Sequence, residues 1–421
     1  MSRLASVVRR VSRLGRLVSV GGRTALSLDT NPVPADWTHV TKVDPEREKR
    51  LPLAYPLYLS HTGAVSVGGS QAVTEDNTEE TFELVNAADV PAFHEPSAAD
   101  HVTGRTRDAA DFMAVPEVLN GDSEALVGKL GRGIDHVREE LAPTYINEKL
   151  PVPLGNGFGD RLSAFAGAWM MEESVFEAYI IMNLDSAAAR EANVTEADLL
   201  DPEAAKHRAI AAETHLDSEV VYVEYSGTFG GEEAVDILEA VDDGVSWSRV
   251  WYGGGLDSRE DARTVLEAGA DAVVVGNVFH EVAGEEADLY EAASEAFATA
   301  PDRDAVREFV ESEVDTGETH AASYLSTITA IPDPEGRATR YLTAGVHAAL
   351  QLRDVAEGLS SPDAATLRAA VPETPPGASA LADAVGDAEG LARQLGTALL
   401  AERTGLEDDA GLPVSHIGLS L

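Results

Sequence analysis

The sequence predicts an α/β fold, a (β/α)8 barrel of the TIM type with one helix reduced, followed by an all-α C-terminal appendage. Eight short apolar runs alternate with helical segments over about 250 residues, as such a barrel requires. Most of these runs are uninterrupted, which is typical of parallel strands buried on both faces. From residue 286 onward the pattern is helical only. We therefore expect three parts: a basic segment (1–34), a barrel (35–285, with an insertion at 151–171) and a helical region (286–421).

The basic segment is an expected amphipathic helix over residues 1–28. It contains arginines without a single acidic residue, and its apolar residues recur at spacings of three and four. It lacks the long apolar core and the cleavage site of a secretory signal. One interpretation is a helix lying on an anionic membrane. A mobile tail, or a helix docked on the acidic body of the protein, is the alternative.

The expected strands and helices follow from these apolar patterns. The strands are Trp37–Val43, Ala64–Val67, Val90–Phe93, Phe112–Val115, Ala178–Met182, Val220–Tyr225, Arg249–Tyr252 and Ala272–Val275. The helices between them include Thr78–Asn86, Ser123–Leu141, Pro202–His215, Glu232–Val241 and Ser258–Ala268. The second interval between strands is short for a barrel helix, so we expect the missing or reduced helix there.

Two segments fall outside the barrel repeat. Pro151–Met171 is glycine-rich, then aromatic and apolar. It could be a flap over the site or a helix packed on a partner subunit, and we favour the interface. The C-terminal region has expected helices but no motif that carries chemistry, so we expect a packing or assembly module. These helices are Glu286–Ala298, Asp304–Glu313, Ala338–Leu359 and Ala378–Arg403.

The composition is strongly acidic, with a formal net charge of −42 and only 5 lysines among the 31 Lys and Arg residues. Acidic residues are spread along the chain, as in proteins that work in concentrated salt, where self-repulsion is screened. An acidic surface for binding a partner is the alternative. Nucleic-acid binding is disfavoured. The chain has no cysteine, which excludes disulfides and thiolate sites, and no apolar run of 18 residues.

Glycines follow three successive expected strands. They lie in Ser226-Gly227, Gly253-Gly254-Gly255 and Gly276-Asn277. The carboxyl ends of barrel strands form the active face, and glycine lets backbone N–H groups approach a phosphate. A single GGG could be only a turn, but three such ends together indicate a phosphate monoester site.

The first two strand ends carry groups suited to a metal and an anion. Lys42 and Asp44 lie on one face of an extended segment, and Lys42 is retained in a chain that avoids lysine. Asp44 suits Mg²⁺, although Asp44-Pro45 could be only a turn initiator. Gly68-Gly69-Ser70 offers backbone N–H groups and a hydroxyl. Glu224 would point a carboxylate at the hydroxyl groups of the ligand, whereas Tyr222 and Tyr225 could be core residues or ligand contacts.

At these residues the chain resembles the geranylgeranylglyceryl phosphate synthases and their bacterial heptaprenyl relatives. The matching pieces lie in order across about 36–285. They are HVTKVDP (39–45), VGGSQAVTEDNT (67–78), FHEPS (93–97), VPEVLN (115–120), EAYIIMNLDSA (177–187), VYVEYSGTFG (221–230) and YGGGLDSREDA with VVVGN (252–277). The chain departs from the family around residues 60–63, 125–130 and 184, and it adds the 151–171 insertion and the C-terminal region.

The resemblance implies a modified TIM barrel that transfers a geranylgeranyl group from its diphosphate to the 3-hydroxyl of sn-glycerol 1-phosphate, the first ether bond of archaeal membrane lipids. Mg²⁺ would be held by Asp44 and Ser70, and Glu224 and Lys42 would be catalytic. The implied substrate-binding residues are Lys42, Tyr222, Val223, Glu224, Tyr225, Ser226, Gly227, Gly253, Gly254, Gly255, Gly276 and Asn277.

Two other functions remain open at this point. A non-catalytic or altered-specificity, membrane-associated paralogue could still bind glycerol phosphate, but it would not need the corner formed by Asp44 and Ser70. Another phosphate-binding barrel enzyme, such as an isomerase or aldolase, would need a Schiff-base lysine or paired acid and base at strand ends. We expect a homo-oligomer in the cytoplasm, with contact at the inner face of the membrane if residues 1–28 bind there.

Overall fold

The computed structural model describes residues 29–69, 71–149, 156–359, 364–371, 380–386, 390–406 and 411–421. The helix expected over residues 1–28 and the expected metal ligand Ser70 lie outside the described residues.

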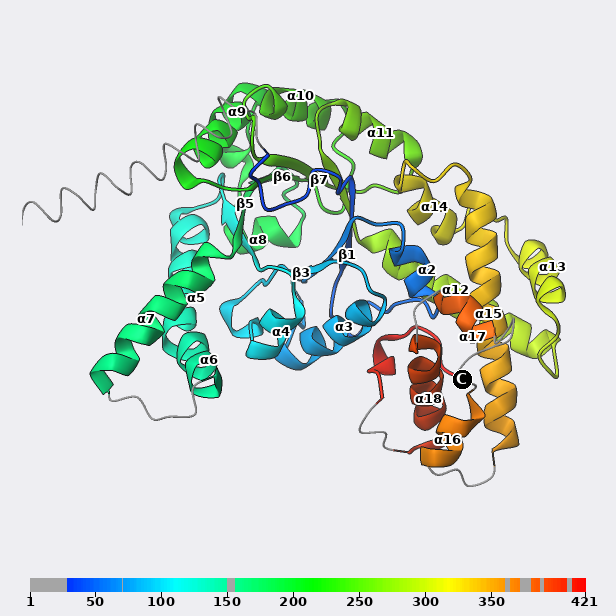
Figure 1. Ribbon diagram of the computed structural model, residues 1–421. Coiled ribbons are helices and arrows are strands. Elements are labelled where there is room, and N and C mark those ends of the chain that lie inside the picture. Colours follow the sequence, from blue (N-terminus) through cyan, green and yellow to red (C-terminus); the bar gives the residue numbers. More distant parts are fainter. Residues whose placement is uncertain are drawn as a thin grey trace, which may run out of the picture.

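Eight parallel strands form a nearly closed barrel in the order β3-β2-β1-β8-β7-β6-β5-β4, which confirms the predicted fold class (Figure 1). Between β3 and β4 the main-chain contact is a single bridge from His94 to Met113. All eight strands overlap the expected ones. They are β1 (His39–Val43), β2 (Ala64–Val67), β3 (Ala92–His94), β4 (Ala114–Val118), β5 (Val175–Ile181), β6 (Val220–Glu224), β7 (Arg249–Gly253) and β8 (Ala272–Val275).

The helices of the barrel differ most from expectation in its first half. The second interval holds a full helix, α3 (Glu75–Ala87), whose Thr74 and Asn77 form a capping box. The prediction that the helix of this interval is missing or reduced is therefore wrong. The short helices are α2 (Tyr55–Leu59) in the first interval and α4 (Gly104–Ala109) in the third, beside the open β3–β4 seam. The later helices are α8 (Ala187–Ala192), α9 (Pro202–Ala211), α10 (Gly231–Asp242), α11 (Arg259–Glu267) and α12 (Asn277–Ala296).

Alternate residues of each strand face two different cores, as the two-residue period of a strand requires. Side chains such as Val40, Phe93 and Trp251 fill the inside of the barrel. Their neighbours, such as Val43 and Tyr252, pack outward against the helices. Each strand therefore places every second side chain beneath or within the site at its carboxyl end.

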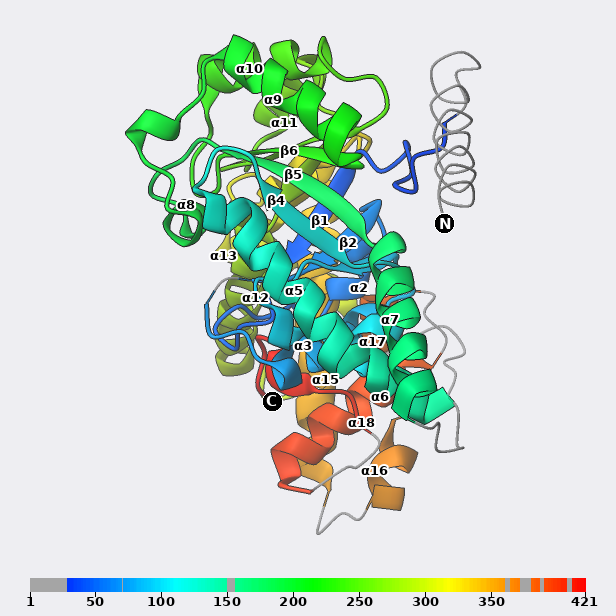
Figure 2. The same cartoon turned by 90° about the vertical axis from the view of Figure 1, so that its left-hand side faces the viewer.

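The fourth interval carries a long helical hairpin. Its first arm runs from Glu124 to Lys149 through η2 (Glu124–Gly128), α5 (Lys129–His136), η3 (Val137–Leu141) and α6 (Ala142–Lys149). Its second arm is α7 (Asn156–Glu172), which contains most of the expected insertion and packs against the first arm around Gly167. Figure 2 shows this hairpin on one side of the barrel.

The C-terminal region packs directly on the barrel rather than standing apart from it. The helices α14 (His320–Thr327) and α15 (Pro334–Gly358) bring Tyr324 and Tyr341 against Tyr58 of the short α2. The expected boundary at 285/286 lies inside α12, the last helix of the barrel. The remaining helices are α13 (Arg303–Glu313), α16 (Ala364–Ala370), α17 (Ala380–Val385) and α18 (Leu391–Thr404), so the helix expected over Ala378–Arg403 is two helices.

Candidate active site

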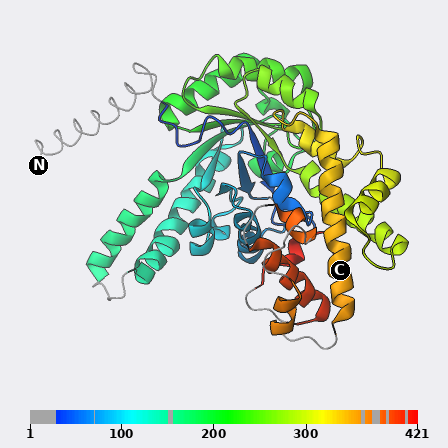
Figure 3. The ribbon, with the colours of Figure 1, turned by 45° about the vertical axis from the view of Figure 1, so that its right-hand side comes forward.

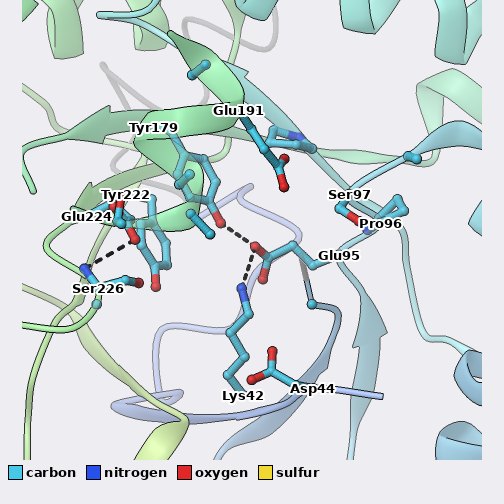
Figure 4. A pocket seen from close by; sticks show the side chains of 18 of the residues that line it. Lys42, Asp44, Glu95, Pro96, Ser97, Tyr179, Glu191, Tyr222, Glu224 and Ser226 are labelled. Atoms are coloured by element: carbon cyan, nitrogen blue, oxygen red, sulfur yellow. Dashed lines mark hydrogen bonds and ion pairs between the residues drawn. The ribbon is translucent and has the colours of Figure 1, made fainter. Parts of the chain in front are cut away.

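A cavity of about 1070 Å³ lies over the carboxyl ends of the strands and extends beneath the helical hairpin. Its floor contains Lys42, Glu95, Tyr179, Tyr222 and Glu224, which come from four different strands or strand ends (Figure 4). The predicted glycines Gly227, Gly253–Gly255 and Gly276 line the same cavity. The barrel therefore brings together groups that are far apart in the sequence.

Lys42 and Asp44 both line the cavity, as the two-residue spacing predicts. Lys42 Nζ lies 3.0 Å from Glu95 Oε1, which also accepts a hydrogen bond from the Tyr179 hydroxyl at 2.5 Å. Glu95 Oε2 accepts a hydrogen bond of 2.7 Å from Ser66, the residue of β2 paired with Lys42. Three strands and one strand end thus converge on the Glu95 carboxylate.

This network fixes the charges of its members. Burial alone would raise the pKa of Glu95, but Lys42 and the Tyr179 and Ser66 hydroxyls outweigh it and hold the pKa below its usual value. Burial would likewise lower the pKa of Lys42, but Glu95 and Asp44 outweigh it and raise the pKa. A cationic lysine and an anionic glutamate therefore face the cavity as an ion pair.

Glu177 lies inside the barrel on β5, two residues before Tyr179, and is 1% exposed. Neither of its carboxyl oxygens has a hydrogen-bond partner among the described residues. Burial, and then the nearby negative charge of Glu95, raise the pKa of Glu177 well above its ordinary value. Burial and Glu95 together outweigh Lys42 and the Tyr179 hydroxyl, which lower the pKa of Glu177, and so favour its neutral form.

Glu224 ends β6 and points into the cavity (Figure 4). Its Oε1 accepts the backbone N–H of Ser226 at 3.2 Å, whereas its buried Oε2 has no hydrogen-bond partner among the described residues. Burial raises the pKa of Glu224. A carboxylate with a raised pKa and an open oxygen is suited to accept the proton of a substrate hydroxyl.

Two of the predicted glycines are required by close approach. A Cβ on Gly253 would lie 1.9 Å from the Tyr222 hydroxyl, and a Cβ on Gly255 would lie 2.9 Å from the Thr228 carbonyl carbon. Gly227 has a φ of +88°, a backbone conformation that favours glycine. These glycines line the cavity, and the Gly255 N–H already donates to the Thr228 carbonyl at 2.7 Å. The three strand ends therefore present main chain, without side chains, to the cavity.

The corner around Asp44 contains hard oxygen donors. A Cβ on Gly69 would lie 3.2 Å from both Asp44 Oδ1 and Glu46 Oε1, so these oxygens flank the same glycine. Lys49 Nζ lies 3.4 Å from Asp44 Oδ2 and donates to Asn277 Oδ1 at 2.9 Å. His280 Nε2 accepts the Asp44 N–H at 3.1 Å, while its Nδ1 faces the Arg50 carbonyl. Among the described residues, no group of three or more His, Cys, Asp or Glu side chains could enclose a metal alone.

The other end of the cavity carries an apolar strip. It is lined there by Val115 and Val118 of β4 and by Leu130 and Ile134 of α5, beside Lys129, Arg132 and His136 of the same helix. Farther out it is lined by Val137, Leu141 and Met171 of the hairpin. The polar floor and this apolar groove are parts of one cavity.

Two expected substrate-binding side chains are not in the cavity. Val223 and Tyr225 face the outer core, where the Tyr225 hydroxyl donates to Glu233 at 2.9 Å. Alternate residues of a strand point to opposite faces, so only their main chain can contribute. Sequence reasoning missed Glu95, Tyr179, Lys49 and His280 as neighbours of the site. The one signal for Glu95 was an acidic residue two positions after the predicted strand Val90–Phe93.

A family model and relatives found by sequence indicate the same family. The model of the PcrB family matches residues 34–297. A geranylgeranylglyceryl phosphate synthase of Methanocella arvoryzae is 30% identical over 250 residues, which cover 59% of this chain and 92% of that protein. A heptaprenylglyceryl phosphate synthase of Bacillus pumilus is 32% identical, with 58% and 91% covered. The crystal structure of (S)-3-O-geranylgeranylglyceryl phosphate synthase from Thermoplasma acidophilum with sn-glycerol-1-phosphate has a TM-score of 0.42 and 20% identity, covering 58% of this chain and 86% of that one.

Proposed function

Because the chain belongs to the PcrB family, we propose that it is a prenyltransferase that joins geranylgeranyl diphosphate to the 3-hydroxyl of sn-glycerol 1-phosphate. The observation that carries the proposal is the single cavity that joins a polar floor at the strand ends to an apolar groove between β4 and α5. A phosphate-bearing acceptor fits the first part and a polyprenyl chain fits the second. The reacting atoms would meet where the two parts join.

The acceptor half rests on glycines and on Glu224. Backbone N–H groups at Gly227, Gly254 and Gly276 would bind the phosphate of the acceptor, whereas the Gly255 N–H donates to Thr228 and Gly253 is paired in the β6–β7 ladder. The oxygen of the acceptor's 3-hydroxyl would attack C1 of the prenyl chain, while Glu224 Oε2 accepts the proton of that hydroxyl. The bond from C1 to the diphosphate oxygen breaks, and its electron pair leaves with the diphosphate. Lys42, beside Gly276, would bind the anionic groups between the two substrates.

The donor half has a place for Mg²⁺. Mg²⁺ prefers one or two carboxylates together with phosphate oxygens and water. Asp44 and Glu46, whose oxygens flank Gly69, fit this preference, and Ser70 follows directly in the sequence. When bound there, the ion would neutralise negative charge on the departing diphosphate. Lys49 would hold Asp44 in place from the side of Asn277.

One observation favours a second candidate, the non-catalytic or altered-specificity paralogue. The Glu95 carboxylate forms an ion pair with Lys42, so the positive charge of the lysine nearest the glycines is already compensated. Anionic substrates would have to compete with Glu95 for this lysine. A protein that binds glycerol phosphate without transferring a prenyl group to it would tolerate such an arrangement.

A product assay separates the two candidates. Purified protein in concentrated salt is incubated with geranylgeranyl diphosphate, Mg²⁺ and radiolabelled sn-glycerol 1-phosphate, and the organic-extractable label is measured. We expect extractable product whose formation requires both substrates. Folded protein that binds glycerol phosphate but forms no product would contradict the proposal and favour the paralogue.

A further inference from the structure

The outer face of α7 is an exposed apolar surface at the edge of the molecule. It is formed by Ala164, Phe165, Ala168 and Trp169, which follow each other at helical spacing between Arg161 and Glu172. Phe165 is 68% exposed and Trp169 is 36% exposed, the former the largest exposed fraction of any large apolar side chain among the described residues. Figure 3 shows the hairpin projecting from the barrel, on the opposite side from the C-terminal helices.

The inner side of the same hairpin lines the apolar groove. Met171 of α7 and Leu141 of η3 belong to the cavity wall, whereas Phe165 and Trp169 do not. The exposed face is therefore adjacent to the part of the cavity that fits the prenyl chain. This link rests on the proposed function.

The hairpin also differs in charge from the rest of the chain. The hairpin, residues 124–172, contains five basic and seven acidic residues, whereas the whole chain has a formal net charge of −42. An anionic lipid surface would therefore repel this segment less than it repels the rest of the protein. Phe165 on this exposed helix face suits the boundary between head groups and acyl chains. The Trp169 ring beside it is only partly exposed, because it also packs against Tyr145 and lies beneath the Arg107 guanidinium.

We propose that α7 is the surface by which this protein docks on a lipid bilayer, with Phe165 and Trp169 inserted at the level of the head groups. Docking there would place the apolar end of the cavity beside the bilayer. A prenyl diphosphate could then enter, and a lipid product could leave, without exposing its chain to water. Within the described residues no helix is long and apolar enough to cross a membrane, so the contact is a surface one.

Vesicle flotation of the full chain tests this proposal. Vesicles of phosphatidylcholine, with and without phosphatidylglycerol, are used in concentrated salt. Two variants disrupt the face in different ways: Phe165→Ser removes an apolar side chain, and Ala164→Glu adds a charge at an exposed position of a helix. The matched control is Ala211→Glu at the exposed end of α9 on the barrel.

We expect the parent protein and the control variant to float with both kinds of vesicle. Each α7 variant should show a roughly tenfold lower ratio of bound to free protein. This factor corresponds to withdrawing one large apolar side chain from the bilayer. Equal flotation of the variants, or no flotation of the parent protein, would overturn the proposal. Two further results would overturn the proposal. One is the loss of all vesicle binding when residues 1–28 alone are deleted. The other is a dimer that the α7 variants convert to monomer while flotation stays unchanged.

The outcome is independent of catalysis. If the proposed transferase activity is absent, flotation through α7 still occurs. If docking is absent, prenyl transfer in detergent solution is unaffected and the α7 variants match the parent protein in that assay. The two failures are therefore distinguishable.

Discussion

At the scale of single residues, the account depends on how their surroundings set the charges of Glu95, Glu177 and Glu224 in and beneath the cavity. Lys42 and two hydroxyls hold the pKa of Glu95 low, whereas burial and the charge of Glu95 raise the pKa of Glu177 and favour its neutral form. Glu224 lies between these extremes, with one oxygen on a backbone N–H and the other open to the cavity. Asp44 lies near the rim beside Lys49. The same side-chain type thus has different roles in different surroundings.

Replacing Glu224 by Gln should reduce kcat by about 10²–10⁴-fold, because a general base contributes a factor of this size. In the parent protein kcat/KM should rise as the pH passes the pKa of Glu224, because only the carboxylate form accepts the proton. Burial raises this pKa above the ordinary value of a glutamate. The variant should lose this rise. Steady-state rates across pH check both points, with Glu232→Gln on the exposed side of α10 as the control. An unchanged pH profile would exclude Glu224 as the base.

Replacing Asp44 by Asn should abolish turnover but leave the binding of sn-glycerol 1-phosphate nearly unchanged. The reason is that Asp44 lies in the expected metal corner, away from the glycines that would bind the acceptor phosphate. Calorimetric titration of glycerol phosphate, beside the rate measurement, checks the separation. Parallel loss of binding and turnover would refute a role confined to the metal.

At the scale of elements, the eight strands could be predicted because buried parallel strands are nearly continuous apolar runs. The clustering of Glu95, Tyr179 and Lys42 could not, since each is ordinary in its own strand and only barrel closure joins them. The same holds for α14: nothing in its sequence shows that Tyr324 donates or accepts a hydrogen bond of 2.7 Å with Thr41 on the outside of β1. The first barrel helix is short, and C-terminal helices cover that side instead.

The joint between barrel and C-terminal region depends on a close contact of α15 with α12. A Cβ on Gly345 would lie 1.8 Å from Glu286 Oε1, so Gly345→Ala should destabilise the protein by about 1–3 kcal/mol, as overpacking does. Gly284 on α12 has no atom within 4 Å of such a Cβ. Gly284→Ala should therefore stabilise the protein by roughly 0.5–1 kcal/mol through helix propensity. Denaturant unfolding in concentrated salt distinguishes them, and equal effects of both changes would contradict this packing.

At the scale of the whole molecule, stability should depend on pH through Glu286. Its carboxylate accepts the N–H groups of Leu53 and Ala54, and burial raises its pKa from 4.5 to about 8. Between these values the folded state holds a proton that the unfolded state has lost, so the free energy of unfolding falls as pH rises from about 4.5 to 8. Glu286→Gln should flatten this fall, which thermal unfolding at pH 5 and pH 8 measures. An equally steep fall in the variant would assign it to other groups, such as Glu219, whose pKa burial raises to about 7.

The whole-molecule claim is that one cavity holds both substrates and joins them through the acceptor oxygen. The most direct test uses sn-glycerol 1-phosphate carrying ¹⁸O in its 3-hydroxyl, with geranylgeranyl diphosphate and Mg²⁺ in concentrated salt, and mass spectrometry of both products. The account predicts that the ether product retains the ¹⁸O and that the released diphosphate contains none. Label in the diphosphate, or glycerol phosphate bound without any ether product, would contradict it.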